Sequence, residues 1–354
     1  MKDRVLSGMR PTGALHLGHY HGALKNWVRL QSDMECYFFV ADWHALTTHY
    51  ESREVIEQNV YEMVIDWLAV GLDPNQCTMF LQSRIPEHAE LFTLLAMGTP
   101  LGWLERVPTY KDQQEKLKDK DLATYGFLGY PLLQAADILI YKAKYVPVGE
   151  DQRQHLELTR DLAGRFNTTF GETFVMPEPL IVKETAKIND LQEPTAKMSK
   201  SLPSGCVFLL EPLKAIEKKI KSAVTDSETV IAFDPEKKPG VSNLLTLQSA
   251  FTGVPVAELV AQYDGQMYGA LKKNVADVVI AFAEPFQQRV NEVLNDKGQV
   301  ITEARIGEEV TVRVRVRSLD RASIPQVALV DATNRANHTH RQLRSAHFHG
   351  KHRH

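Results

Sequence analysis

Residues 197–201 read Lys-Met-Ser-Lys-Ser, and this short run carries the clearest chemistry in the chain. Two lysines beside hydroxyl donors in a Pro- and Gly-bounded loop suit the charge of a phosphoryl group in transit. A solvated basic loop is the alternative for such a motif by itself. A second motif, His-Leu-Gly-His at residues 16–19, lies upstream at the distance of one nucleotide-binding domain and favours the phosphoryl interpretation.

The histidine motif is expected where a strand gives way to a helix. Residues 4–7 are typical of a strand, residues 8–13 of a turn, and residues 17–30 carry apolar side chains at helical spacing. Free backbone N–H groups at a helix start favour phosphate, and Gly18 leaves room for a nucleotide to approach the backbone. Neither G-x-G-x-x-G nor the P-loop motif occurs, so we expect a nucleotide site of another design.

The same histidines raise two other interpretations, a metal site and a pair of structural histidines. Zinc needs further ligands at matching spacing, and the chain's three cysteines, Cys36, Cys77 and Cys206, are scattered without a C-x-x-C pair. Phosphate contact by His16 and His19 is therefore the preferred role, and we expect no metal site in the protein itself.

The surrounding elements alternate in the manner of an α/β protein. Apolar runs at residues 36–41 and 77–82 flank an amphipathic helix at 55–72, and a later strand at 145–148 precedes a helix at 152–166. This alternation predicts a parallel sheet with helices on both faces. Four helical segments then follow at 212–224, 242–251, 256–263 and 268–294, which predicts a second, all-helical domain.

Composition sets broader limits. The 354 residues are 44% hydrophobic and 24% charged, enough for two domains with sizeable cores. Three cysteines suit a reducing cytosol, and neither a signal peptide nor a membrane span is recognisable, so we expect a cytoplasmic protein without membrane contact. Residues 335–354 hold five bases and no acid, so the remainder carries 36 bases against 44 acids. Any nucleic acid must therefore contact local basic patches.

Four motifs in order resemble a known family. The run from Ser7 to Tyr20, read with residues 197–201, resembles the class I aminoacyl-tRNA synthetases. Residues 133–141 (LQAADILIY) and 146–155 (VPVGEDQRQH) are similar to the bacterial tryptophanyl-tRNA synthetases. The resemblance covers about residues 1–295. It implies a Rossmann-like catalytic domain at 1–205, a helical insertion around 84–130 at a homodimer interface, and an anticodon-binding domain at 206–295.

The resemblance also implies a reaction: L-tryptophan and ATP, with Mg²⁺ on the phosphates, form tryptophanyl-adenylate, and the aminoacyl group then passes to tRNA(Trp). An ionised carboxylate attacks the α-phosphate without a general base, so positioning and charge stabilisation carry the catalysis. The catalytic residues are expected to be Lys197, Lys200, His16 and His19. The wider ATP site is expected to comprise Arg10, Gly18, His19, Gly149, Asp151, Gln152, Lys197, Met198, Ser199, Lys200 and Ser201.

Amino-acid specificity is expected to depend on Asp137, which lies in an apolar run where an unpartnered carboxylate is costly to bury. A carboxylate turned to water or neutralised by a structural partner is the alternative on spacing alone. The resemblance implies that it accepts the indole N–H. The other side-chain-binding positions that match the family are Leu6, Gly8, His44, Gln134, Val146 and Val148; Gln134 and Arg10 depart from a common methionine and glutamine of the family.

Two other functions remain from different classes: the tyrosine enzyme, which shares the fold and both signatures, and a catalytically silent binding module.

Residues 296–354 depart from the family. Residues 310–317 alternate apolar and polar as a strand does, and the tail after them is rich in His and Arg. We expect this segment to pack poorly against the body and its removal to leave tryptophan activation unchanged.

Overall fold

The computed structural model describes most of the chain: residues 2–49, 53–107, 124–149, 153–180, 187–295, 303–306, 310–315 and 328–330. The expectations for residues 108–123, for Asp151 and Gln152, and for most of the C-terminal segment fall outside these ranges.

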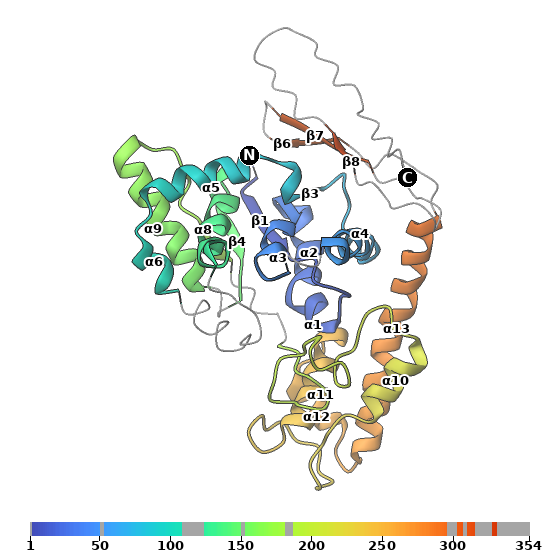
Figure 1. Cartoon of the computed structure of the whole chain (residues 1–354). Helices are drawn as coiled ribbons and strands as arrows, with labels where there is room; N and C mark the ends of the chain where they lie inside the picture. The colour runs from blue at the N-terminus through green and yellow to red at the C-terminus, as the bar shows by residue number, and fades with distance from the viewer. Residues whose placement is uncertain are drawn as a thin grey trace, which may run out of the picture.

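A five-stranded parallel sheet forms the centre of the N-terminal half (Figure 1). Its order is β3-β2-β1-β4-β5, with β1 paired to β2 from Arg4↔Glu35 to Met9↔Val40. The chain reverses its winding beside β1, and in such sheets ligands bind at the carboxyl ends of the strands next to that point. The strand bounds are Arg4–Met9 (β1), Glu35–Val40 (β2), Cys77–Leu81 (β3), Tyr145–Pro147 (β4) and Glu178–Leu180 (β5).

Both faces of this sheet are buried. Alternate strand residues such as Val5 and Phe38 enter one hydrophobic cluster, whereas their neighbours Leu6 and Phe39 enter another. This alternation explains the near-continuous apolar runs, because a strand covered on both faces has no polar side. The prediction of a parallel sheet covered on both sides is confirmed. The helices α2 (Lys25–Asp33), α3 (Asp42–His49), α4 (Arg53–Ala69) and α9 (Arg153–Phe170) lie between its strands in the chain.

The first strand and the helix after it differ in detail from the expectation. β1 extends to Met9, so Gly8 lies in the strand and the turn is shorter than residues 8–13. The helical run begins with α1 (Leu17–His19) and passes through a π-helical turn at Tyr20–Leu24 before α2. A π turn leaves no spacing signature that differs clearly from an α-helix, so the apolar pattern could not distinguish them.

The region around residues 84–130 is helical where the structure describes it. It contains α5 (Glu87–Gly98), α6 (Leu101–Glu105) and the start of α8 (Tyr125–Ile140), after a 3₁₀ turn at Gln82–Arg84. These helices group with α9 on one side of the molecule (Figure 1).

Four helices follow residue 205: α10 (Leu213–Lys221), α11 (Pro239–Thr252), α12 (Val256–Gln262) and α13 (Tyr268–Asn295). The expectation of helices here is confirmed. One hydrophobic cluster joins them to the sheet, since it includes Val5 and Trp27 as well as Leu244 and Phe286. The division into domains at residue 205 stays a prediction.

At the C-terminus, β6 (Glu303–Ile306), β7 (Val310–Arg315) and β8 (Ala328–Val330) form an antiparallel sheet of order β6-β7-β8. The strand predicted from the alternation is confirmed for residues 310–315. This small sheet lies near β3 (Figure 1).

Among the described residues, no single helix has the length and apolar character needed to cross a membrane; one bent pair, α11 with α12 at 110°, meets that test by length and composition only.

Candidate active site

The two histidines of the N-terminal motif cap the start of their helix. His16 is the N-cap of α1, and its Nδ1 accepts a hydrogen bond from the Gly18 backbone N–H at 3.1 Å. The His19 Nδ1 accepts from the His16 backbone N–H at 3.2 Å. Because both Nδ1 atoms are acceptors, the neutral rings carry their protons on Nε2. Each imidazole is thus fixed as an Nε2–H donor.

Both rings are held in the neutral form. Burial, followed by the effect of the Lys200 cation, lowers the pKa of His16 to about 4. The pKa of His19 falls to about 2 through burial, followed by the effects of His16 and Lys200. At neutral pH the pair therefore offers hydrogen bonds rather than two positive charges.

Gly18 has a structural reason that the sequence did not reveal. A Cβ at this position would lie 2.9 Å from the Cε1 and Nδ1 atoms of the His16 ring. The space next to the Gly18 backbone is thus used by the capping imidazole. Packing against His16 is thus one reason for glycine at this position, and the approach of a nucleotide stays a prediction.

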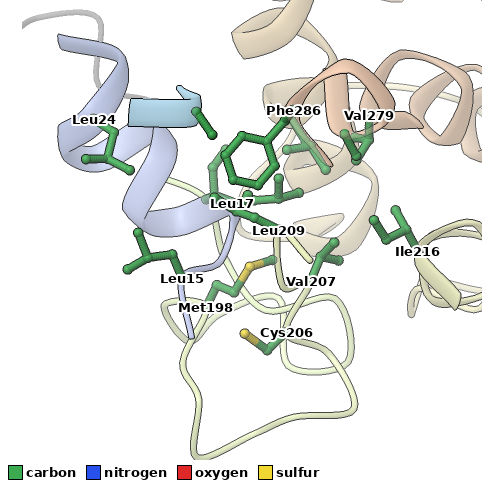
Figure 2. Packing of buried hydrophobic residues seen from close by; sticks show 14 of the residues in the cluster. Leu15, Leu17, Leu24, Met198, Cys206, Val207, Leu209, Ile216, Val279 and Phe286 are labelled. Atoms are coloured by element: carbon green, nitrogen blue, oxygen red, sulfur yellow. The ribbon is translucent and has the colours of Figure 1, made fainter. Parts of the chain in front are cut away.

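The segment with the histidine motif is joined by main-chain hydrogen bonds to the segment that follows the lysine loop, residues 197–201. Leu17 N–H donates to the Val207 carbonyl at 3.0 Å, and Leu209 N–H donates to the Leu15 carbonyl at 2.9 Å. Figure 2 shows the side chains of Leu15, Leu17 and Met198 gathered in one apolar cluster beneath this junction. Met198 is 5% exposed, so this motif residue anchors the loop through packing. Two segments almost 200 residues apart in the sequence thereby form one unit.

Asp190 supports the base of the lysine loop. Its Oδ1 accepts hydrogen bonds from the backbone N–H groups of Gln192 and Glu193 at 2.8 and 3.0 Å. A Cβ on Gly205 would lie only 1.7 Å from this oxygen, so the position admits no side chain without rearrangement. The turn between Asp190 and Gly205 is therefore fixed before any ligand binds.

Within the loop, the structure brings Lys200 to the N-terminal turn. Its Nζ donates to the Gly13 carbonyl at 2.7 Å, where Gly13 has a φ of +115° that favours glycine. The pKa of Lys200 is lowered to about 8, chiefly by burial; Cys206 opposes the shift and the positive Arg10 contributes to it. The Ser199 and Ser201 hydroxyls lie 2.8 Å apart. The backbone of Lys197 pairs with that of Asn189 in an isolated antiparallel β-bridge.

Arg10, His16, His19 and Lys200 thus form one cluster, which we call the phosphate end. Among the described residues, Lys200 has no carboxylate within ion-pair distance. Burial also lowers the pKa of Arg10, against an opposing effect of Tyr130. Two cations, Arg10 and Lys200, held beside the Nε2–H donors of His16 and His19 are suited to bind an anion. In the described part of the chain, no group of three or more His, Cys, Asp or Glu residues could hold a metal ion.

Asp137 lies on α8, in a second cluster that we call the amino-acid end. It is 1% exposed, yet its carboxylate is well supplied with donors. His44 Nε2 lies 2.8 Å from Oδ2, while Gln82 Nε2 and His88 Nδ1 lie 2.8 and 2.7 Å from Oδ1. Burial raises the pKa of Asp137, but the hydrogen bonds from His44 and His88 outweigh burial and hold the pKa below its usual value. The residue is therefore an ionised carboxylate inside the protein.

The other positions expected to bind the amino-acid side chain surround the same part of the sheet. Leu6, Val146 and Val148 belong to the apolar cluster on that face. A Cβ on Gly8 would lie 2.4 Å from the Phe39 ring, so glycine is needed there for packing. Gln134 precedes Asp137 by three positions on α8, which places both on one side of the helix. Gly149 is exposed just after β4, and Asp151 and Gln152 lie outside the described residues.

Comparison with known proteins decides the family. The family model for class I tRNA synthetases (W and Y) matches residues 2–284. The chain belongs to this synthetase family.

Individual relatives agree with this family assignment. A tryptophan–tRNA ligase of Streptomyces avermitilis is 48% identical over 91% of this chain and 96% of its own length. A tryptophan–tRNA ligase of Ralstonia nicotianae is 78% identical over 48% of this chain, a match that spans only 42% of that relative. The crystal structure of a Campylobacter jejuni tryptophanyl-tRNA synthetase is similar with a TM-score of 0.69 and 35% identity, over 83% of this chain and 90% of that one.

A match over 91% of the chain must run past residue 295. The family model ends at residue 284, in keeping with a resemblance that covers about residues 1–295, and this one alignment continues beyond that point.

Sequence reasoning missed several residues that shape both ends of this synthetase site. Gln82, His88 and Tyr141 surround Asp137, and Asp190 and Gly205 hold the lysine loop. A buried acid requires donors, so the polar residues Gln82 and His88 that follow the third strand were a signal for the first group. No local signal marked Gly205, because its constraint arises from a contact with Asp190 across the loop.

Proposed function

We propose that this synthetase is a tryptophan–tRNA ligase that forms tryptophanyl-adenylate from L-tryptophan and ATP, releases pyrophosphate, and transfers the aminoacyl group to tRNA(Trp). The observation that carries the proposal is Asp137, an ionised carboxylate that is 1% exposed beside the apolar residues assigned to side-chain binding. Relatives 43 to 48% identical over most of the chain are named tryptophan–tRNA ligases.

At the amino-acid end, Asp137 accepts the indole N–H, and Leu6, Val146 and Val148 pack against the ring. Gly8, His44 and Gln134 complete this surface. A buried acceptor discriminates strongly against a side chain without a donor, since the acceptor would remain unpaired. A phenylalanine side chain offers no such donor.

At the phosphate end, the substrate carboxylate attacks the α-phosphorus of ATP and the bond to pyrophosphate breaks. The Nε2–H groups of His16 and His19 donate to the phosphate oxygens, and Lys197 and Lys200 neutralise charge that develops on the leaving group. Arg10, Met198, Ser199 and Ser201 complete the phosphate-binding surface. Mg²⁺ enters with ATP as part of the substrate.

Asp151 and Gln152 are assigned to the adenosine or to the ammonium group of the amino acid, and Gly149 and Gly18 to the ATP site. The position of Gly149 just after β4, at the carboxyl edge of the sheet, supports this assignment. The Campylobacter jejuni enzyme is described as complexed with ADP and tryptophane, which is the ligand pair that these two ends would hold.

A homodimer is part of the proposal. Large apolar side chains are exposed on the helices assigned to the insertion, notably Leu94 (67%), Met97 (81%), Leu101 (60%) and Tyr125 (65%). Such side chains on neighbouring helices favour burial against a second copy.

A local basic surface for tRNA is proposed on α10, in the region assigned to anticodon binding. It is formed by Lys214, Lys218 and Lys221. We place the enzyme in the cytoplasm, in keeping with its free thiols.

ATP–pyrophosphate exchange measured separately with L-tryptophan, L-tyrosine and L-phenylalanine tests the activity. We expect exchange with tryptophan only. Exchange with tyrosine would identify the tyrosine enzyme, and exchange with none of the three would indicate a binding module. Charging of tRNA(Trp) then tests the second step separately.

A further inference from the structure

The carboxylate of Asp137 has two chemically different oxygens in this structure. Oδ1 receives hydrogen bonds from both Gln82 and His88, while Oδ2 receives one, from His44, among the described residues. An ionised carboxylate has about four acceptor positions, two on each oxygen. Oδ1 is therefore saturated, and Oδ2 keeps one position for a further donor.

His88 lies behind the saturated oxygen. It comes from α5, is 0% exposed, and is enclosed by the rings of Phe39, Phe80 and Tyr141 at centroid distances of 5.4 to 6.1 Å. A side chain so enclosed does not reach a bound substrate. Any influence of His88 on the reaction must therefore pass through Asp137.

Tyr141 holds the other end of the His88 ring. The carboxylate only accepts, so His88 donates from Nδ1, and its Nε2 then accepts from the Tyr141 hydroxyl at 2.8 Å. Loss of that hydroxyl would leave Nε2 as a buried acceptor without a donor. The His88 ring would then keep only its hydrogen bond to Oδ1 among the described residues, and its orientation against Asp137 would be less well fixed.

We propose that His88 and Tyr141 form a positioning pair that fixes Asp137 as an ionised acceptor with Oδ2 open, and thereby sets the preference for an amino-acid side chain that carries a ring N–H. The proposal deepens the function proposed above and rests on it. The role of His44 differs, because it shares the open oxygen and lies among the residues assigned to substrate binding.

The surroundings of Asp137 explain why the pair is needed. Among the described residues, the titratable groups facing this cluster are His44 on α3, His88 on α5 and Tyr141 at the C-cap of α8, with Tyr37 on β2 and Glu87 on α5 acting on Tyr141. Burial alone would favour a protonated carboxyl, which can donate and rotate. Donors at both oxygens oppose that outcome and fix the acceptor in one orientation.

The test compares L-tryptophan with its isostere in which sulfur replaces the ring N–H, using ATP–pyrophosphate exchange by the full-length enzyme. The ratio of the two kcat/KM values measures recognition of the N–H. We expect this ratio to fall about three- to tenfold in Tyr141→Phe, as for the loss of one hydrogen bond, and further in His88→Leu. His88→Asn, which can still donate to Asp137, is expected to restore much of it. kcat for tryptophan should change less than its KM.

A pH series adds an independent readout. Wild-type KM for tryptophan should be flat from pH 8 to pH 6, because the pKa of Asp137 is held below its usual value. In His88→Leu the lost donor lets that pKa rise, so KM should increase as the pH falls. Tyr263→Phe is the matched control: Tyr263 is 3% exposed and donates to Gln248 Oε1 at 2.9 Å, in the helices after the lysine loop. Its ratio should equal that of the wild type.

The outcomes distinguish the positioning pair from the role of Asp137 in the proposed function. Equal losses for both substrates in Tyr141→Phe would show a purely structural role and overturn the proposal; if His88→Leu does not fold, Tyr141→Phe alone decides. An unchanged ratio in Asp137→Asn would instead refute the role of Asp137 in the proposed function, and the positioning pair with it. A ratio that collapses in Asp137→Asn but stays constant in Tyr141→Phe would overturn only the positioning pair.

Discussion

The amino-acid end and the phosphate end of the site treat charge in opposite ways. At the amino-acid end, Asp137 is compensated by His44, Gln82 and His88 before any ligand binds. At the phosphate end, Arg10 and Lys200 lie near each other, and the pKa of Lys200 is lowered through burial and this like charge. The first region has its donors in place, whereas Lys200 in the second has no carboxylate partner among the described residues and favours an anion. Selectivity and rate would thus arise in different places.

Replacing Lys200 should have the largest effect. Lys200→Ala removes a cation that we expect to act on the leaving group, so kcat in ATP–pyrophosphate exchange should fall about 10²- to 10³-fold. ATP binding should weaken far less, because the interaction strengthens in the transition state. A higher KM for ATP with unchanged kcat would contradict this assignment and make the phosphate end a simple binding surface.

Replacing Asp137 tests the compensated region. Asp137→Asn keeps the shape of the side chain, but its new NH₂ group would face the hydrogen-bond donors that surround Asp137. We therefore expect kcat/KM for tryptophan to fall about 10²-fold, in line with the loss of a buried hydrogen bond to a charged group. KM for ATP should stay near the wild-type value. Near-normal tryptophan exchange would mean that the carboxylate has only a structural role.

Asp66 offers an internal contrast to Asp137, since it is buried without equivalent donors. It is 3% exposed, its Oδ1 has no partner among the described residues, and burial, with Glu62, raises its pKa to about 7. The folded protein therefore retains this proton more strongly than the unfolded chain, so stability falls as the pH rises from about 4 to 7.

Asp66→Asn should therefore raise the free energy of unfolding by about 2 kcal/mol at pH 8 and have little effect at pH 4. Urea unfolding at the two pH values measures it. Asp73→Asn is the opposite control, because hydrogen bonds from Asn75 and Gln76 lower the pKa of Asp73. A gain that is equal at both pH values would rule out a cause in the ionisation of Asp66.

The pH dependence of ATP use should show the smallest effect. With a Lys200 pKa of about 8, kcat/KM for ATP should fall above that pH by up to about tenfold per pH unit. His16 and His19, with pKa values of about 4 and 2, should add no change between pH 6 and 7. Lys200→Arg should move the alkaline limb upward, since a guanidinium stays charged. If the alkaline fall in kcat/KM for ATP did not move, it would have to arise from the titration of another group.

Much of the fold followed from local patterns. Apolar runs of strand length identified β1 to β4, and helical periodicity identified α4, α9 and the four helices after residue 205, because burial on both faces of a sheet or one face of a helix leaves a regular trace in the sequence. The π turn at Tyr20–Leu24 and the extension of β1 through Gly8 left no such trace. The effect of removing residues 296–354 stays a prediction.

The sequence by itself determined which groups could act: the paired lysines and histidines, and an acid within an apolar run. Only the tertiary structure decided their states. The caps at His16 and His19 fix both tautomers, Gly205 has to leave room for Asp190, and His88 reaches Asp137 from a helix 49 positions away. These states depend on burial and on partners distant in the chain, and the pKa of a side chain responds to both, so no local pattern could have specified them.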